Sequence, residues 1–348
     1  MMNSHKELFS HLRSLFLPFL LLLGQIGLKV EARLLCHSSE KLFVFGDSYV
    51  DTGNTNKEYP GSWKDPYGMT YPGKPSGRFS DGRVLTDYIA DYLGLKSPIA
   101  YQLRNEVPSY YLKYGMNFAC GGTGLFAGNP NMTTQIDFFE QLIEENVYNA
   151  SDLNNSLALL SALGNDYFDY LKHGSIWGFK SFVDSLVNQM TTNLIRIQKL
   201  GVKKIVVTSL PPFGCIPAIS GFNPLKRCLN IINIIPIAHN KLLNQSITKL
   251  NQETIDGATF VFLDLYDSFM SVINDPSTNN ITEYYTACCL GVSSKYVCGS
   301  VDENNEKQYK VCENPESTMF WDPIHPTQAG WHAVYNNLQM DDLGQLQC

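Results

Sequence analysis

The sequence predicts an α/β fold in which a mainly parallel sheet is covered by helices on both faces. Two observations predict it. Short apolar runs of strand length alternate with longer amphipathic runs along the chain. In the clearest unit, FKSFVDSLVNQMTTNLIRIQKLGVKKIVVTSLPP, a helix ends at Gly201, a strand follows at Ile205–Val207, and Pro211 and Pro212 stop it. Strands and helices that alternate in this way build parallel sheets.

The other elements follow from the same two periodicities. Residues 81–95 predict a helix with Asp81 as its cap and Gly94 at its end, because its apolar residues fall on one stripe: Val84, Leu85, Tyr88, Ile89, Tyr92 and Leu93. Apolar runs predict strands at 42–45, 157–163 and 259–266. Further helices are expected at 235–252 and 325–338. The Gly/Pro/Tyr-rich segment 59–77 and the Cys-rich segment 286–314 are expected to be insertions in one domain.

The composition is that of a globular protein with a sizeable core. Of the 348 residues, 44% are hydrophobic and 17% are charged. The net charge is −7, and no basic cluster extends beyond Lys203–Lys204. A nucleic-acid partner is therefore disfavoured, because phosphate contacts need concentrated Lys and Arg.

The N-terminus is typical of a cleaved secretory signal. Lys6 and Arg13 precede an apolar stretch at 15–23, and residues 1–32 are predicted to be removed. The alternative is a membrane anchor, but the apolar core is shorter than the roughly 20 residues that a span needs. Pro18 and Gln25 also interrupt the stretch.

Cysteines and glycosylation sequons agree with secretion. Four of the nine cysteines lie between positions 288 and 312, a crowding typical of disulfides that fix a loop. A zinc site is the weaker alternative, because Cys288 and Cys289 are adjacent and no histidine is near. Pairing of Cys215 with Cys228, and pairs within 288–312, are expected. Five Asn-x-Ser/Thr sequons occur, at Asn131, Asn149, Asn154, Asn244 and Asn280.

A serine and a histidine at opposite ends of the chain suggest nucleophilic catalysis. Ser48 follows the first strand in FVFGDSYVDTGN, where the carboxyl ends of parallel strands form ligand sites. A serine hydroxyl needs a base, and His325 stands in FWDPIHPTQAG three residues after Asp322. Alone, this turn is better explained by a turn residue at Asp322 and a helix cap at His325. Together with Gly-Asp-Ser it predicts a Ser/His/Asp system.

Two further segments offer donors for an oxyanion. MNFACGGTG contains Gly121 and Gly122, whose backbone N–H groups can approach a substrate closely. LGNDYFDY follows the second predicted strand and supplies the side-chain amide of Asn165. Each segment alone is better explained by an ordinary turn.

These motifs, in this order, resemble the GDSL esterase/lipase family of the SGNH hydrolase superfamily, in its secreted plant branch. The resemblance covers residues 41–338 and implies a flavodoxin-like three-layer α/β/α sandwich. It implies Ser48 as nucleophile, His325 as base and Asp322 as its orienting residue. The oxyanion hole would combine the N–H groups of Ser48 and Gly122 with Asn165, with Gly121 as the alternative to Gly122.

The resemblance implies a secreted serine esterase or lipase, in the cell wall or apoplast, that acts on a small-molecule ester or lipid. No metal, cofactor, nucleic acid or membrane span is expected. Acyl transfer by the same serine, and a non-catalytic binding protein on the same scaffold, remain as alternatives.

Three positions depart from the family pattern, and one of them is Thr123, where the plant branch often has Ala. Tyr49 replaces the usual Leu of the GDSL signature and is expected to shape the pocket. Cys120 replaces a usual Ser and is expected to be a small buried residue or the unpaired thiol.

Overall fold

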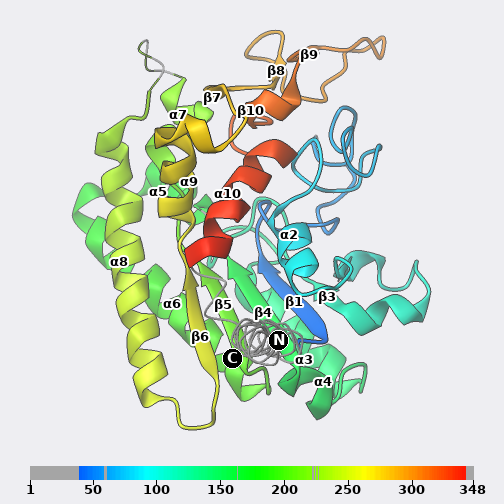
Figure 1. Ribbon diagram of the computed structural model, residues 1–348, viewed down its shortest axis with the longest axis vertical. Coiled ribbons are helices and arrows are strands. Elements are labelled where there is room, and N and C mark those ends of the chain that lie inside the picture. Colours follow the sequence, from blue (N-terminus) through cyan, green and yellow to red (C-terminus); the bar gives the residue numbers. More distant parts are fainter. Residues whose placement is uncertain are drawn as a thin grey trace, which may run out of the picture. The chain divides into compact units, whose positions relative to one another are not determined.

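The computed structural model describes residues 39–341 except 59–60, 163, 222, 224 and 226. The predicted signal segment, 1–32, lies outside the described residues, as do Cys36 and Cys348. Within the described part, a six-stranded sheet has the order β2-β3-β1-β4-β5-β6, and each neighbouring pair is parallel (Figure 1). The predicted parallel α/β fold is therefore confirmed. The strands are β1 (Lys41–Gly46), β2 (Ile99–Ala100), β3 (Gly115–Asn117), β4 (Ser156–Ser161), β5 (Lys204–Thr208) and β6 (Thr259–Leu263).

The strand order places a reversal in the middle of the sheet. Without the short edge strand β2, the strands run second, first, third, fourth, fifth in chain order, which is the flavodoxin-like arrangement. The chain therefore leaves β1 in one direction and later returns to its other side with β4. The two strands β1 and β4 flank the switch point.

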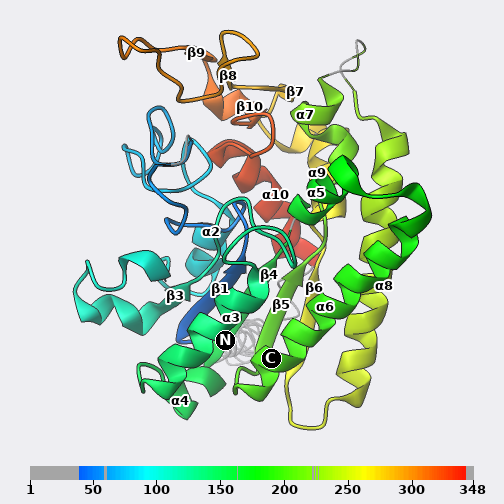
Figure 2. The same cartoon turned by 180° about the vertical axis from the view of Figure 1, so that it is seen from behind.

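Helices form a layer on each face of the sheet (Figures 1 and 2). On one face α2 (Leu85–Tyr92), α9 (Leu265–Asn274) and α10 (Gln328–Asp341) pack together, and on the other α3 (Met132–Glu144), α6 (Phe179–Lys199) and α8 (Asn230–Glu253) do so. The shorter helices are α4 (Ala150–Asn154), α5 (Asn165–His173) and α7 (Pro217–Ser220). Among the described residues, none of the helices has the length and apolarity needed to cross a bilayer.

The core lies between the sheet and these helices. Every residue of β1 is buried, which explains why its sequence is a continuous apolar run instead of an alternation. Phe43 and Phe45 face Phe139 of α3, with ring centroids 4.5 and 5.6 Å apart. Each such buried side chain contributes roughly 1.5–3 kcal/mol to folding.

Two details of the predicted elements are wrong. Asp81 does not cap α2: the N-cap is Val84, and the Asp87 carboxylate accepts the Val84 N–H (2.9 Å). Asp81 instead accepts the Gln328 N–H (2.7 Å), so it joins the start of α10 to this loop. The run predicted as a strand at 259–266 ends at Leu263, because Asp264 caps α9 by accepting the Asp267 N–H.

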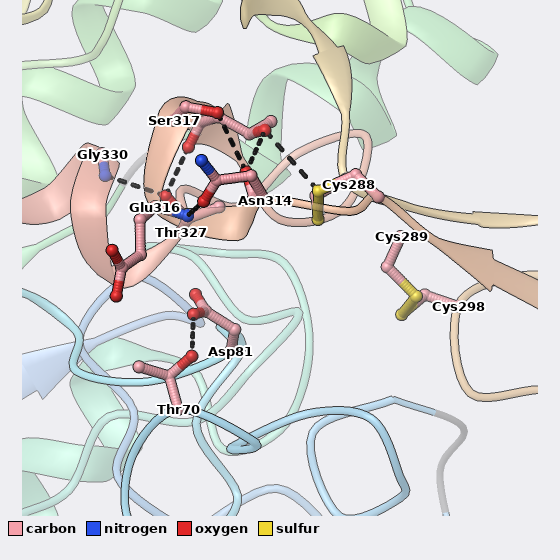
Figure 3. The surroundings of a disulfide bond; sticks show 12 residues. Thr70, Asp81, Cys288, Cys289, Cys298, Asn314, Glu316, Ser317, Thr327 and Gly330 are labelled. Carbon is pink, nitrogen blue, oxygen red and sulfur yellow. Dashed lines mark hydrogen bonds between the residues drawn. A yellow bond between two sulfur atoms is a disulfide. The ribbon is translucent and has the colours of Figure 1, made fainter. Parts of the chain in front are cut away.

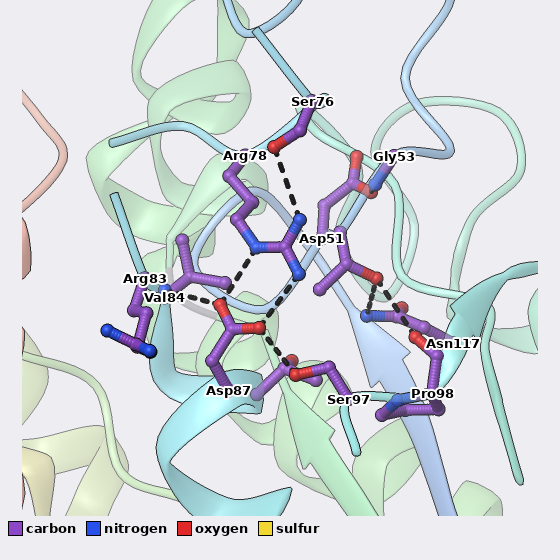
Figure 4. A network of polar contacts seen from close by, with 12 residues as sticks. Asp51, Gly53, Ser76, Arg78, Arg83, Val84, Asp87, Ser97, Pro98 and Asn117 are labelled. Atoms are coloured by element: carbon purple, nitrogen blue, oxygen red, sulfur yellow. Dashed lines mark hydrogen bonds and ion pairs between the residues drawn. The ribbon is translucent and has the colours of Figure 1, made fainter. Parts of the chain in front are cut away.

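A buried ion pair fixes the chain that follows the 59–77 insertion (Figure 4). The Arg78 guanidinium donates to both oxygens of Asp87, each at 2.8 Å. Burial acts to raise the pKa of Asp87, but the charge and donors of Arg78 lower it below its ordinary value. Removal of either partner would leave an uncompensated buried charge.

The Cys-rich segment forms a small disulfide-linked unit. Strand β7 (Glu283–Ala287) pairs in parallel with β10 (Thr318–Phe320), and β8 (Cys289–Gly291) pairs antiparallel with β9 (Tyr309–Val311). The disulfides here are Cys288–Cys312 and Cys289–Cys298, and Cys215–Cys228 lies before α8. These pairs are the expected ones, and they leave no thiolates for the alternative zinc site.

Candidate active site

At the switch point of the sheet, the serine and the asparagine follow the ends of two paired strands, β1 and β4. Ser48 lies just past β1, and Asn165 begins α5 just past β4. The last residue of β1, Gly46, must be a glycine. Its φ is +146°, and a Cβ there would lie 2.0 Å from the Ser161 carbonyl oxygen. The strand therefore ends in glycine because β4 passes too close for any side chain.

A hydrogen-bonded chain links the three predicted catalytic side chains. Ser48 Oγ lies 2.8 Å from His325 Nε2, across 277 positions of sequence. His325 Nδ1 lies 2.8 Å from Asp322 Oδ1 and 2.7 Å from Oδ2. All three side chains are buried. This is the geometry that a serine nucleophile, its base and an orienting carboxylate need.

The D-x-x-H spacing works because the carboxylate closes its own turn. Asp322 Oδ1 accepts the backbone N–H groups of Ile324 and His325, both at 2.9 Å. The Trp321 N–H donates to the His325 carbonyl at 2.7 Å, which closes the same turn from the other side. The imidazole is thereby held against the carboxylate that orients it.

The charge state of Asp322 follows from these contacts. Burial acts to raise the pKa of its carboxyl, but His325 and the two backbone donors lower it, and the net pKa lies below its ordinary value. Asp322 therefore stays ionised at neutral pH and can stabilise an imidazolium.

The two adjacent glycines, Gly121 and Gly122, have different roles. The Gly121 N–H is used, since it donates to Thr55 Oγ1 (2.8 Å) and Asp51 Oδ2 (3.0 Å). A Cβ at Gly121 would lie 2.4 Å from the Phe79 ring, so the position of that ring allows only glycine at 121. Gly122 adopts φ +78°, and across the described residues no hydrogen bond is recorded for its N–H or for that of Ser48. The geometry favours Gly122 over Gly121 as an oxyanion donor.

Asn165 lies beside this glycine loop. Its Nδ2 donates to the Thr123 carbonyl at 2.8 Å. An amide nitrogen carries two hydrogens, so the second remains available to a substrate oxygen. The predicted oxyanion donors thus come from the turn after β1, the loop after β3 and the start of α5.

Comparison with known proteins decides the family. A profile described as GDSL-like lipase/acylhydrolase matches residues 42–338. The chain belongs to this family. One GDSL esterase/lipase of Arabidopsis thaliana is 45% identical over 338 residues, which are 93% of this chain and 94% of that protein. A second from the same plant is 47% identical over 308 residues, covering 86% and 87% of the two chains.

As a GDSL family member, the protein is a carboxylic ester hydrolase. Among solved structures it is similar to a catalytic mutant of Axe2, an acetylxylan esterase from Geobacillus stearothermophilus, at 15% identity and a TM-score of 0.43. That match covers 89% of this chain and 94% of the other. In the described part of the chain, no group of three or more His, Cys, Asp or Glu is placed to hold a metal ion.

Asp166 supports the glycine loop beside the candidate oxyanion donors, a role that the sequence analysis does not assign to it. Its carboxylate accepts three consecutive backbone N–H groups, those of Leu125, Phe126 and Ala127, each at 2.8 Å. These bonds tie the glycine loop to the start of α5 in this GDSL enzyme. The only sequence signal is its place in Gly-Asn-Asp.

The turn after Ser48 is held by two polar side chains. Asp51 accepts the N–H groups of Gly53 and Asn54, both at 2.7 Å, and burial raises its pKa despite these donors. Asn54 Nδ2 donates to the carbonyls of Asn117 and Ala119, each at 2.8 Å, so it joins this loop to the end of β3.

Tyr49 supports the turn beside the candidate catalytic residues. Its side chain is buried, its hydroxyl donates to the Ile324 carbonyl (2.8 Å), and its ring meets Trp331 edge-on. The hydroxyl that Leu would lack supports the turn that carries His325.

The expectation that Cys120 is a small buried residue is confirmed. It is a free, buried cysteine next to Gly121. Burial, and secondarily the charge of Asp51, raise the pKa of its thiol to about 12. A thiol in this state is a packing group and a poor nucleophile.

Proposed function

We propose that this GDSL family member hydrolyses esters through a covalent acyl-enzyme on Ser48. The observation that carries the proposal is the 2.8 Å contact between Ser48 Oγ and His325 Nε2, with Asp322 on the other ring nitrogen. A binding protein would not need this complete chain of groups.

The first half of the reaction forms the acyl-enzyme. Ser48 Oγ attacks the ester carbonyl carbon while His325 Nε2 takes the hydroxyl proton, and the carbonyl electron pair moves onto oxygen. The N–H groups of Ser48 and Gly122 and the Asn165 amide stabilise that oxyanion. When the tetrahedral intermediate collapses, His325 returns the proton to the departing alcohol.

The second half releases the acid. Water attacks the acyl carbonyl while His325 again takes a proton, and the same donors hold the second oxyanion. Collapse returns the proton to Ser48 Oγ and frees the carboxylic acid. Asp322 remains ionised throughout and stabilises the imidazolium that forms in each half.

We also propose that the enzyme is secreted. The apolar N-terminal stretch supports this, as do the disulfides Cys215–Cys228, Cys288–Cys312 and Cys289–Cys298. The sequon asparagines Asn149, Asn154, Asn244 and Asn280 are exposed, and Asn131 is partly so while it caps α3. Glycosidase-sensitive mass in secreted protein, with an N-terminus beyond residue 32, is the expected result.

Active-site labelling tests the catalytic proposal. A fluorophosphonate is expected to modify wild-type protein at Ser48, located by peptide mass spectrometry, and to lose that adduct in Ser48→Ala. His325→Ala should slow labelling strongly, whereas His332→Ala, an exposed histidine on α10, should label normally. An adduct on another residue, or equal labelling rates in His325→Ala and wild type, would refute the assigned roles.

A further inference from the structure

The catalytic carboxylate has a partner far from it in sequence. The Tyr67 hydroxyl donates to Asp322 Oδ2 at 2.8 Å, across 255 positions. Tyr67 belongs to the Gly/Pro/Tyr-rich insertion, and its side chain is buried. Burial, and then the charge of Asp322, raise the pKa of the phenol well above its usual range, so it remains a donor at any pH where the enzyme works.

We propose that Tyr67 is a positioning residue for the ester hydrolysis, acting through Asp322 on the orientation of the His325 imidazole. This inference rests on the proposed function, because it takes Asp322 as the orienting carboxylate. Among the described residues, Tyr67 makes no side-chain hydrogen bond or ring contact with Ser48 or with the oxyanion donors.

The contacts of Asp322 explain why one hydroxyl matters. The imidazole contacts both carboxylate oxygens, but Oδ1 also accepts the backbone N–H groups of Ile324 and His325, whereas the other partner of Oδ2 is Tyr67. Without the phenol, the imidazole is the only remaining partner of Oδ2 of this buried carboxylate. The plane of the carboxylate can then rotate relative to the turn. A hydrogen bond to a charged group is among the stronger ones, so its loss is felt.

Aromatic rings extend this support to both sides of the catalytic pair. The Tyr67 ring meets Trp321 edge-on at 6.0 Å and Phe79 edge-on at 6.4 Å. Phe79 in turn lies against the His325 ring, with centroids 4.9 Å apart. Tyr67 of the insertion thus contacts the carboxylate, and Phe79, just after the insertion, covers the His325 ring.

The disulfide-linked unit holds Tyr67 in place. A second hydrophobic cluster, separate from the main core, contains Tyr67 and Trp321 together with Tyr309 and three disulfide-bonded cysteines: Cys288, Cys289 and Cys298. Close packing extends to the backbone, since a Cβ at Gly299 would lie 3.2 Å from the Asp65 carbonyl oxygen. The loop after Cys298 thus packs directly on the chain that precedes Tyr67.

The same unit holds the backbone that leads into Asp322. The Cys288 N–H donates to the Phe320 carbonyl at 2.9 Å, and the Cys289 N–H donates to the Trp321 carbonyl at 2.6 Å. Figure 3 shows these adjacent cysteines beside the Asn314–Ser317 turn that enters β10, with Cys298 next to Cys289. Asp322 is therefore held by its side chain through Tyr67 and by its backbone through the cysteines.

The test uses Tyr67→Phe, which keeps the ring packing and removes only the hydroxyl. Tyr148→Phe is the matched control, because that buried tyrosine also gives up one hydroxyl contact, to the Leu112 carbonyl, at a distant place in the fold. Tyr67→Phe is expected to lower kcat about tenfold with KM nearly unchanged, the size of one hydrogen bond to a charged group. Its acid limb in the pH profile should also shift, because the carboxylate that faces the imidazole has lost a donor.

The outcomes separate the two proposals. If Ser48→Ala abolishes turnover while Tyr67→Phe matches Tyr148→Phe in kcat and pH profile, the proposed function stands and the positioning role is overturned. If Ser48→Ala turns over ester normally, the proposed function itself is overturned.

A double-mutant cycle tests the link to the cysteines. The pair Cys289→Ala and Cys298→Ala removes one disulfide, and its effect on kcat should be markedly smaller in a Tyr67→Phe background than in wild type. Fully additive losses would show that the disulfide does not act through Tyr67.

Discussion

The two sides of the proposed active site are built from different kinds of structure. The nucleophile side, with Ser48, Gly122 and Asn165, stands on the ends of parallel strands at the middle of the sheet. The base side, with Asp322 and His325, stands on an irregular turn between β10 and α10. That turn is held by a tyrosine from an insertion and by a disulfide-linked unit.

The difference shows where precision comes from in each case. On the nucleophile side, strand geometry fixes the positions, and short motifs such as Gly-Asp-Ser and Gly-Asn-Asp supply the local contacts. On the base side no regular element fixes the turn, so hydrophobic packing, disulfides and the Tyr67 hydroxyl take that role. The base side should therefore be more sensitive to changes distant in sequence.

The largest expected effect is on the base side. Asp322→Asn keeps the size of the side chain but removes its charge and favours the wrong imidazole tautomer, so kcat should fall about 10⁴-fold. Steady-state kinetics on a chromogenic ester would measure it, with Asp91→Asn, an exposed residue of α2, as the control. A loss smaller than about tenfold would mean that His325 does not depend on this carboxylate.

His239 shows what burial does to an imidazole without a carboxylate. Its Nδ1 lies 2.9 Å from the Tyr167 hydroxyl, and burial lowers its pKa from 6.5 to about 4. As pH falls, the unfolded chain therefore binds a proton at His239 before the folded protein does. The stability that the neutral, buried imidazole allows is complete above pH 6.5 and is lost as pH falls toward 4.

The expected loss over that window is on the order of 3 kcal/mol. Denaturant unfolding of wild type between pH 7 and 4 should show it, and His239→Gln should remove most of that slope. Equal slopes in the two proteins would assign the acid sensitivity to other groups.

On the nucleophile side, the sharpest change is Asp166→Ala. Three backbone N–H groups at 125–127 lose their acceptor, so Gly122 should drift from its position and kcat should fall about thirtyfold, less than removal of an oxyanion donor itself. Hydrogen exchange at 125–127 should accelerate while exchange around Asp322 stays unchanged. Accelerated exchange on both sides would show that they are not independently built.

The smallest effect is expected at Cys120. A maleimide should leave it unmodified in the folded enzyme, because its thiol is buried and its pKa is raised to about 12. Cys120→Ser should keep kcat within about twofold of wild type, as expected for a packing residue. Rapid modification that stops turnover would contradict this reading of the glycine loop.

What could be predicted from the sequence follows the same division. The parallel sheet, Ser48 at a strand end and the D-x-x-H turn all depend on local patterns, so they were accessible. Tyr67 was not, because its partner lies 255 positions away and no periodicity marks the contact. The prediction that Asp81 caps the helix beside it failed for the same reason, since its carboxylate instead accepts an N–H at the start of α10.

Trapping of the covalent intermediate tests the central claim most directly. Wild-type enzyme would be mixed with excess ester, quenched in acid during turnover and digested, and its peptides would be weighed. The account predicts the acyl mass on the peptide that contains Ser48, and its absence in Ser48→Ala, which should not turn over. Undiminished ester hydrolysis by Ser48→Ala, or an acyl group found on a different residue, would contradict it.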